Sequence, residues 1–219
     1  MKKYFFLLTI LTCISSFSFS QYSVSAGPTF IRPFGYQGIY PGLHIGVELN
    51  DDDFQTLYGR FSFLPYKSGD STSSVVQGID INTNPYTVPV SLTERYNYSM
   101  LEFGKRYYFG DGYESGFGFY GGSTINLIFN SIKYRVGEYD KTKYFSSFDE
   151  SQKGSIVSFG LGLNGGIKNS FSFGTLFFDA GLSYSLLQIG SPNLNSLPTP
   201  ESYRSLLFTF NLGFRKDFY

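Results

Sequence analysis

The chain has 219 residues, with 17 basic and 17 acidic side chains, and aromatic residues make up 20% of it. This neutral balance gives no electrostatic basis for a nucleic-acid partner, because proteins that bind nucleic acids concentrate positive charge to neutralise phosphates. The only cysteine is Cys13. If the first twenty residues are removed on export, no disulfide framework and no thiolate metal site can form.

The first twenty residues have the pattern of an export signal. Two lysines give a basic start, a short apolar core follows, and Ser18 and Ser20 place small side chains just before a cleavage position. We therefore expect residues 1–20 to be a signal peptide and residues 21–219 to form one exported domain. A lipoprotein signal cut before Cys13 is the alternative, which the threonine that precedes this cysteine disfavours.

The exported part contains eight segments in which apolar side chains recur at every second position, as in half-buried strands. The last segment is the clearest, because Phe208, Phe210, Leu212 and Phe214 fall on one face of an extended chain. Turn-like interruptions separate the segments, which is typical of an up-and-down meander. The expected strands cover residues 21–31, 38–50, 55–65, 95–109, 116–130, 155–168, 173–187 and 204–219.

The exported part also has the features of a membrane protein that crosses with strands. After the signal no apolar run approaches eighteen residues, so no helical span is expected. In hydrocarbon, only a closed barrel satisfies the backbone groups of strands. Short connections are expected at residues 50–54, 110–115 and 168–172, and long ones at 66–94, 131–154 and 188–203. Extension of strands into parts of the long connections, beyond the membrane, is the alternative. We therefore predict an all-β, eight-stranded antiparallel up-and-down transmembrane β-barrel in the outer membrane, with both termini in the periplasm.

The same alternation assigns charged side chains to the inside of the barrel. The inward phase carries three acids, three arginines and one histidine, namely His44, Glu48, Arg60, Glu102, Arg106, Asp179 and Arg215. Eight strands enclose an interior just wide enough for side chains, and a buried charge needs a partner. We predict that these residues form a packed polar network. A proton or ion pathway through them and a catalytic role are the alternatives.

Three further patterns resemble ligand-binding or catalytic motifs but lack the context that the chemistry needs. G-x-G-x-x-G stretches begin at Gly116 and Gly160, yet they lie inside alternating strands with no helix to follow. The acidic turn at Asp51 lacks the spaced ligands of a calcium loop. A second histidine and a G-x-S-x-G elbow are both absent. We expect no cofactor or metal, and a lipid-modifying enzyme with His44 as its base stays an alternative.

The connection over residues 131–154 mixes charged residues with aromatic ones. The aromatic residues are Tyr134, Tyr139, Tyr144, Phe145 and Phe148. Exposed Tyr and Phe favour protein interfaces, so we predict that this loop contacts a partner. The alternative is that these residues belong to an interfacial aromatic girdle or to strand extensions.

Residues 95–109 read RYNYSMLEFGKRYYF, and the chain ends on Phe218 and Tyr219. Together with the export signal, this pattern resembles the outer-membrane β-barrel family of Bacteroidota, the porin-like barrels associated with type IX secretion. The resemblance implies a fold and a location, and it carries no catalytic residues with it.

These observations lead to one expected function and two alternatives. We expect a non-enzymatic barrel, embedded in outer-membrane lipid, that acts as a structural or accessory subunit of a larger outer-membrane complex for secretion, uptake or barrel assembly. It would act through its extracellular loops or its barrel wall. A small solute channel is the first alternative, and the lipid-modifying enzyme is the second.

Overall fold

The structure is a computed structural model that describes residues 22–35, 38–52, 54–146, 153–190 and 205–218. The predicted signal peptide lies outside these residues. The described strands are β1 (Tyr22–Pro33), β2 (Tyr40–Asp52), β3 (Gln55–Gly78), β4 (Thr87–Gly110), β5 (Phe117–Val136), β6 (Tyr144–Phe145), β7 (Lys153–Phe171), β8 (Gly174–Ile189) and β9 (Leu206–Phe218). Within the described ranges, no helix is long and apolar enough to cross a membrane.

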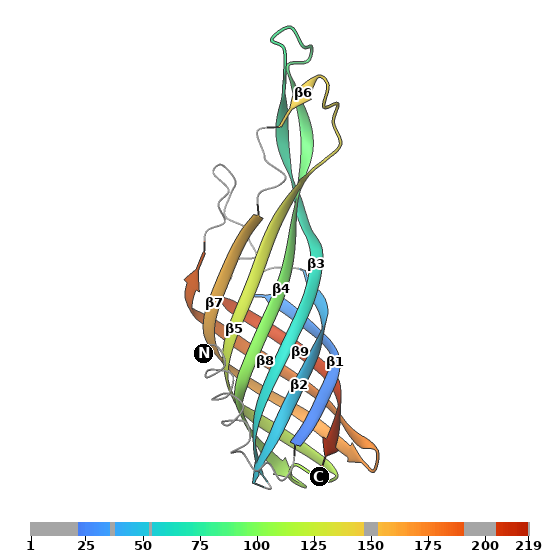
Figure 1. Cartoon of the computed structure of the whole chain (residues 1–219), viewed down its shortest axis with the longest axis vertical. Coiled ribbons are helices and arrows are strands. Elements are labelled where there is room, and N and C mark those ends of the chain that lie inside the picture. The colour runs from blue at the N-terminus through green and yellow to red at the C-terminus, as the bar shows by residue number, and fades with distance from the viewer. Residues whose placement is uncertain (1–21, 36–37, 53, 147–152, 191–204, 219) are drawn as a thin grey trace, which may run out of the picture.

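Eight of these strands form a closed antiparallel ring (Figure 1). Each strand pairs with the next one along the chain, β5 pairs with β7, and β9 closes the ring against β1. Closure removes the free edges that would leave backbone groups unpaired in hydrocarbon. The predicted eight-stranded up-and-down transmembrane barrel is confirmed.

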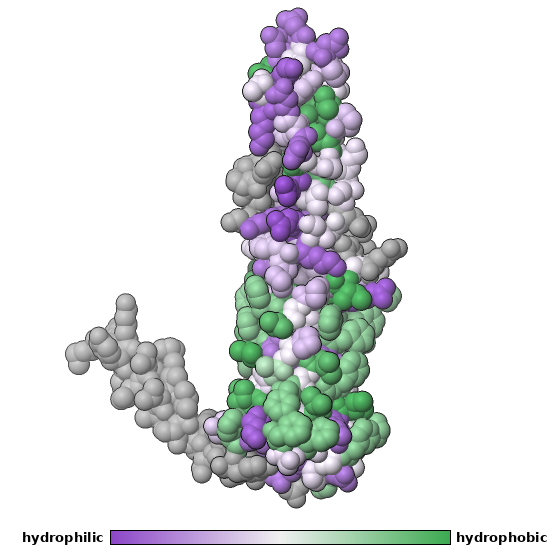
Figure 2. Space-filling model, turned by 90° about the vertical axis from the view of Figure 1, so that its right-hand side faces the viewer, coloured by the Kyte–Doolittle hydropathy of each residue, from purple (hydrophilic) through white to green (hydrophobic). Residues whose placement is uncertain are grey.

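The two faces of the ring differ in polarity, as the alternation predicts. On β9 the outward side chains Phe210, Leu212 and Phe214 are exposed, whereas Asn211 between them and Arg215 after them are buried. The same pattern on the other strands produces a belt of exposed apolar side chains around the barrel (lower part of Figure 2). An exposed belt of this size suits contact with hydrocarbon rather than with water.

The two ends of the barrel are unlike each other. At one end β1 begins and β9 ends, with the rings of Tyr22 and Phe218 stacked 5.2 Å apart; we call it the terminal end. At the opposite end β3 and β4 continue beyond the ring as a hairpin, and β6 adds to it through Gln77 and Gly78. This extension, residues 71–91 together with 137–146, is called the arm (Figure 1).

The arm corrects one expectation, because residues 66–94 were predicted to be a connection and instead form most of an extended hairpin. Val76 and Val90 explain the difference, since both turn inward and are buried. They join the apolar side chains that fill the barrel below them. β-Branched residues between the Ser and Thr positions therefore favour paired strands over a loop.

The interior side chains form two layers along the barrel. Toward the arm they make an apolar cluster of Ile31, Tyr40, Leu64, Val76, Val90, Leu92, Tyr96, Tyr98, Met100, Ile128, Ile132, Tyr134, Val136, Ile156 and Leu207. Toward the terminal end the buried residues are mostly charged, hydroxylated, amide or aromatic side chains. The charged layer contains the residues that the sequence assigned to the lumen.

Candidate functional site

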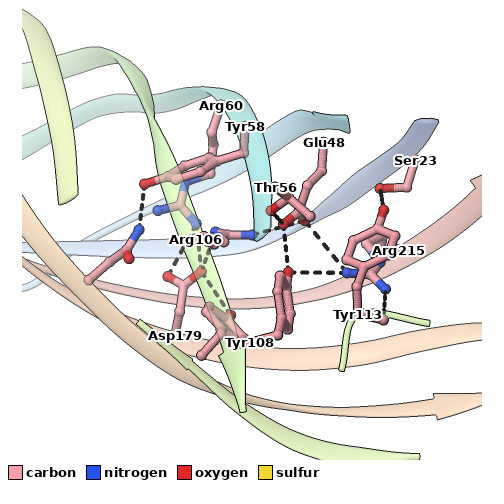
Figure 3. Close-up of polar contacts among 12 residues, drawn as sticks. Ser23, Glu48, Thr56, Tyr58, Arg60, Arg106, Tyr108, Tyr113, Asp179 and Arg215 are labelled. Atoms are coloured by element: carbon pink, nitrogen blue, oxygen red, sulfur yellow. Dashed lines mark hydrogen bonds and ion pairs between the residues drawn. The ribbon is translucent and has the colours of Figure 1, made fainter. Parts of the chain in front are cut away.

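Asp179 lies at the centre of the charged layer, fully buried on β8. Its Oδ2 accepts hydrogen bonds from Arg60 Nη1 at 2.9 Å and from Arg106 Nη2 at 3.0 Å. Asn211 Nδ2 donates to Oδ1 at 2.6 Å, and the Tyr120 hydroxyl donates to Oδ2 at 3.3 Å. Side chains from β3, β4, β5 and β9 thus converge on one carboxylate across the lumen. Figure 3 shows Arg60 and Arg106 beside Asp179.

Two glutamates complete the charge balance of this layer. Arg60 Nε donates to Glu102 Oε2 at 2.6 Å, and Arg106 Nη1 donates to Glu48 Oε2 at 3.2 Å. Arg215 Nη1 lies 3.6 Å from the same Glu48 oxygen. Three arginines therefore face three carboxylates, and this balance offsets the cost of removing the charges from water.

Hydroxyl groups satisfy the remaining acceptor of Glu48. Thr56 Oγ1 and the Tyr108 hydroxyl each donate to Glu48 Oε1 at 2.5 Å. Arg215 Nη1 in turn donates to the Tyr108 oxygen at 3.2 Å. The network is therefore continuous from the centre of the barrel to its terminal end, which makes it rigid as well as neutral.

Aromatic rings pack around Arg106. Its guanidinium carbon lies 4.0 Å from the centroid of the Tyr58 ring and 4.9 Å from that of Tyr120. A glycine makes room for the second ring, because a Cβ at Gly166 would lie 2.5 Å from Tyr120 Cζ. Tyr58 is fixed in turn by a hydrogen bond from Asn164 Nδ2 to its hydroxyl. Arg106 is thus held by cation–π contacts as well as ion pairs.

The turn between β4 and β5 folds back under the terminal end of the barrel. Tyr113 in this turn places its ring 3.9 Å from the Arg215 guanidinium carbon, and its carbonyl accepts from Arg215 Nη2 at 2.9 Å. Its hydroxyl donates to Ser23 Oγ at 2.7 Å. Positive φ angles of 88° at Gly110 and 75° at Gly112 permit this reversal. The sequence predicted only a short connection here and missed that it covers the lumen.

The network leaves almost no free volume. The cavity between Glu48, Tyr58, Arg60 and Arg106 measures about 10 Å³, which is close to the minimum that one water molecule needs. A solute cannot pass this level of the barrel without breaking the ion pairs. The described part of the lumen is thus a packed interior and has no pore at this height.

His44 lies beside the network rather than in it. The side chain is buried, and its ring packs 5.9 Å from the ring of Phe177, in space that Gly213 leaves free. It forms no ion pair with the described side chains, whereas the six charged residues predicted with it are joined by direct contacts. Because the ring points inward, it does not reach the lipid-facing surface. The described residues also contain no group of three potential metal ligands.

The aromatic residues predicted to contact a partner lie in different environments. The predicted exposure of Tyr134 is wrong, because this side chain shares the inward phase of Ile132 and is only 5% exposed. Tyr139 and Tyr144 are half-buried against the apolar cluster. Phe145, on β6, is 45% exposed. Phe148 lies outside the described residues.

The exposed apolar residues at this end gather instead at the end of the arm. Ile79, Ile81, Tyr86 and Phe145 are all exposed, Ile81 by 85%; we call these four residues the arm tip. Local bonds hold the tip in shape, since Gly78 N donates to the Tyr86 carbonyl and Tyr144 donates to the Pro85 carbonyl. The two isoleucines were missed because the surrounding Ser, Thr and Asn residues indicated a loop.

The loop that carries β6 is also locally ordered. The hydroxyl and the backbone amide of Thr142 donate to Asp140 Oδ1 at 2.6 and 3.0 Å. These hydrogen bonds lower the pKa of the Asp140 carboxyl below its usual value. The loop is therefore held as a compact turn beside the tip.

No protein-family model and no curated protein matches the chain. Solved structures do match over most of its length. The outer membrane protein OprG from Pseudomonas aeruginosa aligns with a TM-score of 0.50 and 13% identity, covering 91% of this chain and 96% of that chain. A major outer membrane protein from Thermus thermophilus aligns with a TM-score of 0.49 and 16% identity, covering 90% and 99%. Ail of Yersinia pestis, in complex with the heparin analogue sucrose octasulfate, aligns with a TM-score of 0.47 and 13% identity, covering 90% and 98%. The likeness to OprG is one of fold. At this identity it assigns no activity.

Proposed function

We propose that the chain is an integral outer-membrane protein whose closed barrel anchors the arm, and that the arm tip binds a protein partner in a larger outer-membrane complex. The observation that carries this proposal is the exposed apolar tip at the end of a braced hairpin. The eight residues of β3 from Ser71 to Gly78 alone extend about 26 Å. Because a rigid support already orders the tip, less conformational entropy is lost when a partner binds.

The proposed orientation places both termini in the periplasm and the arm outside the cell. It is supported by the short β2–β3, β4–β5 and β7–β8 connections at the terminal end and by the arm at the opposite end. Outer-membrane barrels have short periplasmic turns and longer extracellular segments. The chain has no cysteine after Cys13, so single introduced cysteines can test this arrangement in whole cells. A membrane-impermeant maleimide should label Ile81→Cys and leave Ser172→Cys, in the β7–β8 turn, unlabelled; the reverse pattern contradicts the orientation.

Two features support a binding role over the alternatives. The ion network fills the lumen at one level, which argues against a solute channel, and His44 faces away from lipid substrates, which argues against a lipid-modifying enzyme. Patches of exposed apolar residues on folded proteins mark interaction sites. The resemblance to barrels associated with type IX secretion supports an accessory role in a secretion complex.

The test is capture of partners from native membranes. The chain with an affinity tag ahead of Tyr22 is solubilised in mild detergent, and stoichiometric partners are identified by mass spectrometry. The variant Ile79→Ser/Ile81→Ser should lose at least about 90% of the captured partner, since both tip side chains become polar. Ser73→Ala, on the same hairpin, should behave as the unmodified chain does.

Two outcomes would overturn the proposal. The first is recovery of the unmodified barrel without any stoichiometric partner. The second is recovery of the same partner at the same level with the tip variant. Because folded barrels resist unfolding by SDS without heating, a gel shift confirms that each variant is folded before partners are compared.

A further inference from the structure

Two cations lie directly opposite each other on the outer face of the barrel. Arg95 on β4 and Lys133 on β5 are cross-strand partners in the register. Both belong to the outward phase, because Tyr96 and Ile132 next to them are buried. Like charges in this position destabilise a sheet unless an anion compensates them. Within the described ranges neither residue forms an ion pair.

Tyr66 holds these two side chains in place. Lys133 Nζ lies 4.2 Å from the centroid of the Tyr66 ring, and the Arg95 guanidinium carbon lies 6.0 Å from it. The Tyr66 hydroxyl is 2.9 Å from Ser131 Oγ, which fixes the ring. Arg95 Nε is buried and has no hydrogen-bond partner among the described residues. We call Tyr66, Arg95 and Lys133 the cationic site.

The cationic site lies at the edge of the apolar belt, on the side of the arm. On β5 the last strongly exposed apolar side chain is Phe129, and Lys133 follows four residues later. Four residues of a tilted strand advance about 10 Å along a barrel axis. The headgroup layer of a bilayer is about 5–7 Å thick on each side of the hydrocarbon. The backbone at Lys133 thus lies about 3–5 Å beyond this layer. The long lysine and arginine side chains can span that distance by bending back toward the lipid phosphates.

We propose that the cationic site binds the phosphate of a lipid headgroup in the leaflet on the arm side. Arg95 supplies a planar fork of donors that fits two phosphate oxygens, and Lys133 adds a point charge. The bound anion would relieve the repulsion between the two cations and accept from Arg95 donors, of which Nε has no partner among the described residues. This inference rests on the membrane insertion included in the proposed function, but it does not depend on the protein partner.

The test measures lipid retention by the purified barrel in phosphate-free detergent solution, using native mass spectrometry. The probes are diphosphoryl lipid A and a galactolipid that has no phosphate. The unmodified barrel should retain lipid A and lose the galactolipid. Arg95→Gln/Lys133→Gln should bind lipid A at least about 10-fold more weakly, because two charge-assisted contacts are lost.

The control variant is Lys141→Gln/Lys143→Gln, which removes the same charge from exposed positions in the β5–β6 loop. It should retain lipid A as well as the unmodified barrel does. Arg95→Lys keeps the charge and removes the fork, so an intermediate loss of about 3-fold is expected. This single change also keeps the proposal testable if the double variant does not fold.

Three results would overturn the proposal. They are equal lipid A retention by the unmodified and double-variant barrels, equal retention of the galactolipid, and complete displacement of lipid A by millimolar inorganic phosphate. The last result would indicate a site for free anions. Because this measurement uses the isolated barrel, it can succeed when partner capture fails. Partner capture can likewise succeed when lipid A retention is unchanged.

Discussion

Substitution of Asp179 by Asn tests whether the charged layer is a dry, paired network. The change preserves the shape of the side chain but removes the charge that Arg60 and Arg106 share at 2.9 and 3.0 Å. It also replaces one of the two acceptor oxygens by an NH₂ group. That group faces either the Arg60 and Arg106 donors at Oδ2 or the Arg60 and Asn211 donors at Oδ1. Arg60 keeps Glu102 and Arg106 keeps Glu48, so the layer is left with one uncompensated positive charge.

An uncompensated buried charge costs about 3–5 kcal/mol. We expect Asp179→Asn to lower the free energy of unfolding by about 3 kcal/mol, near the lower limit, because each arginine retains one carboxylate. Urea titration of the folded barrel in lipid vesicles, followed by tyrosine fluorescence, measures this loss. Asp51→Asn is the matched control, since this exposed carboxylate bonds only Gln55 Nε2 among the contacts described. The Asp51→Asn variant should lose less than about 0.5 kcal/mol of its free energy of unfolding.

A second substitution separates charge balance from general damage. Arg106→Gln in the Asp179→Asn background removes the excess charge, and Glu48 still has Arg215, Thr56 and Tyr108 as partners. The double variant should therefore recover at least about 1 kcal/mol relative to Asp179→Asn alone. A loss below about 1 kcal/mol in the single variant would contradict a dry, paired layer, because it would mean that water screens the lumen.

Three further predictions concern packing, the terminal end and the lumen. Gly166→Ala should lower the free energy of unfolding by about 1–3 kcal/mol, because the added methyl would lie 2.5 Å from both the Tyr120 ring and the Phe178 carbonyl oxygen; urea titration measures it, and an unchanged midpoint would contradict the packing described. Tyr113→Ala removes the ring from Arg215 and the bond to Ser23, and should cost about 1–3 kcal/mol in the same assay. In planar bilayers the unmodified barrel should give no discrete conductance steps, whereas steady single-channel currents would show an open lumen.

The strands and the charged layer could be predicted from sequence because both depend on a local pattern. A period of two assigns each residue to a face without knowledge of its neighbours in space. The charges of Glu48, Arg106 and Asp179 were therefore placed inside correctly. Their pairing could not be predicted, since it depends on the stagger between strands far apart in the chain.

The length of the arm was not predicted, for a physical reason. Ser, Thr and Asn, which are typical of loops, are frequent in it. Val76, Val88 and Val90 continue the inward apolar phase. Contacts with the apolar cluster determine how far the strands extend beyond the ring. These contacts cannot be predicted from the composition of the segment. The same contacts place Tyr134 inside, where a prediction from residue type had placed it in an exposed loop.

The covered terminal end and the cationic site depend on contacts between strands and turns. Tyr113 reaches Ser23 and Arg215 only because the β4–β5 turn reverses under the barrel. Arg95 and Lys133 become neighbours only through the β4–β5 register. A sequence pattern identifies the residues of such sites but does not show which of them contact each other in the fold.

In the proposed function, the arm tip contacts a protein partner while the barrel serves as an anchor. Photo-crosslinking in living cells tests this contact, with a photoreactive amino acid at position 81 and a control at Ser73. A discrete crosslinked protein is expected from position 81, because Ile81 is 85% exposed, and none is expected from Ser73. The absence of a crosslink from position 81, or the same products from both positions, would contradict the proposed contact.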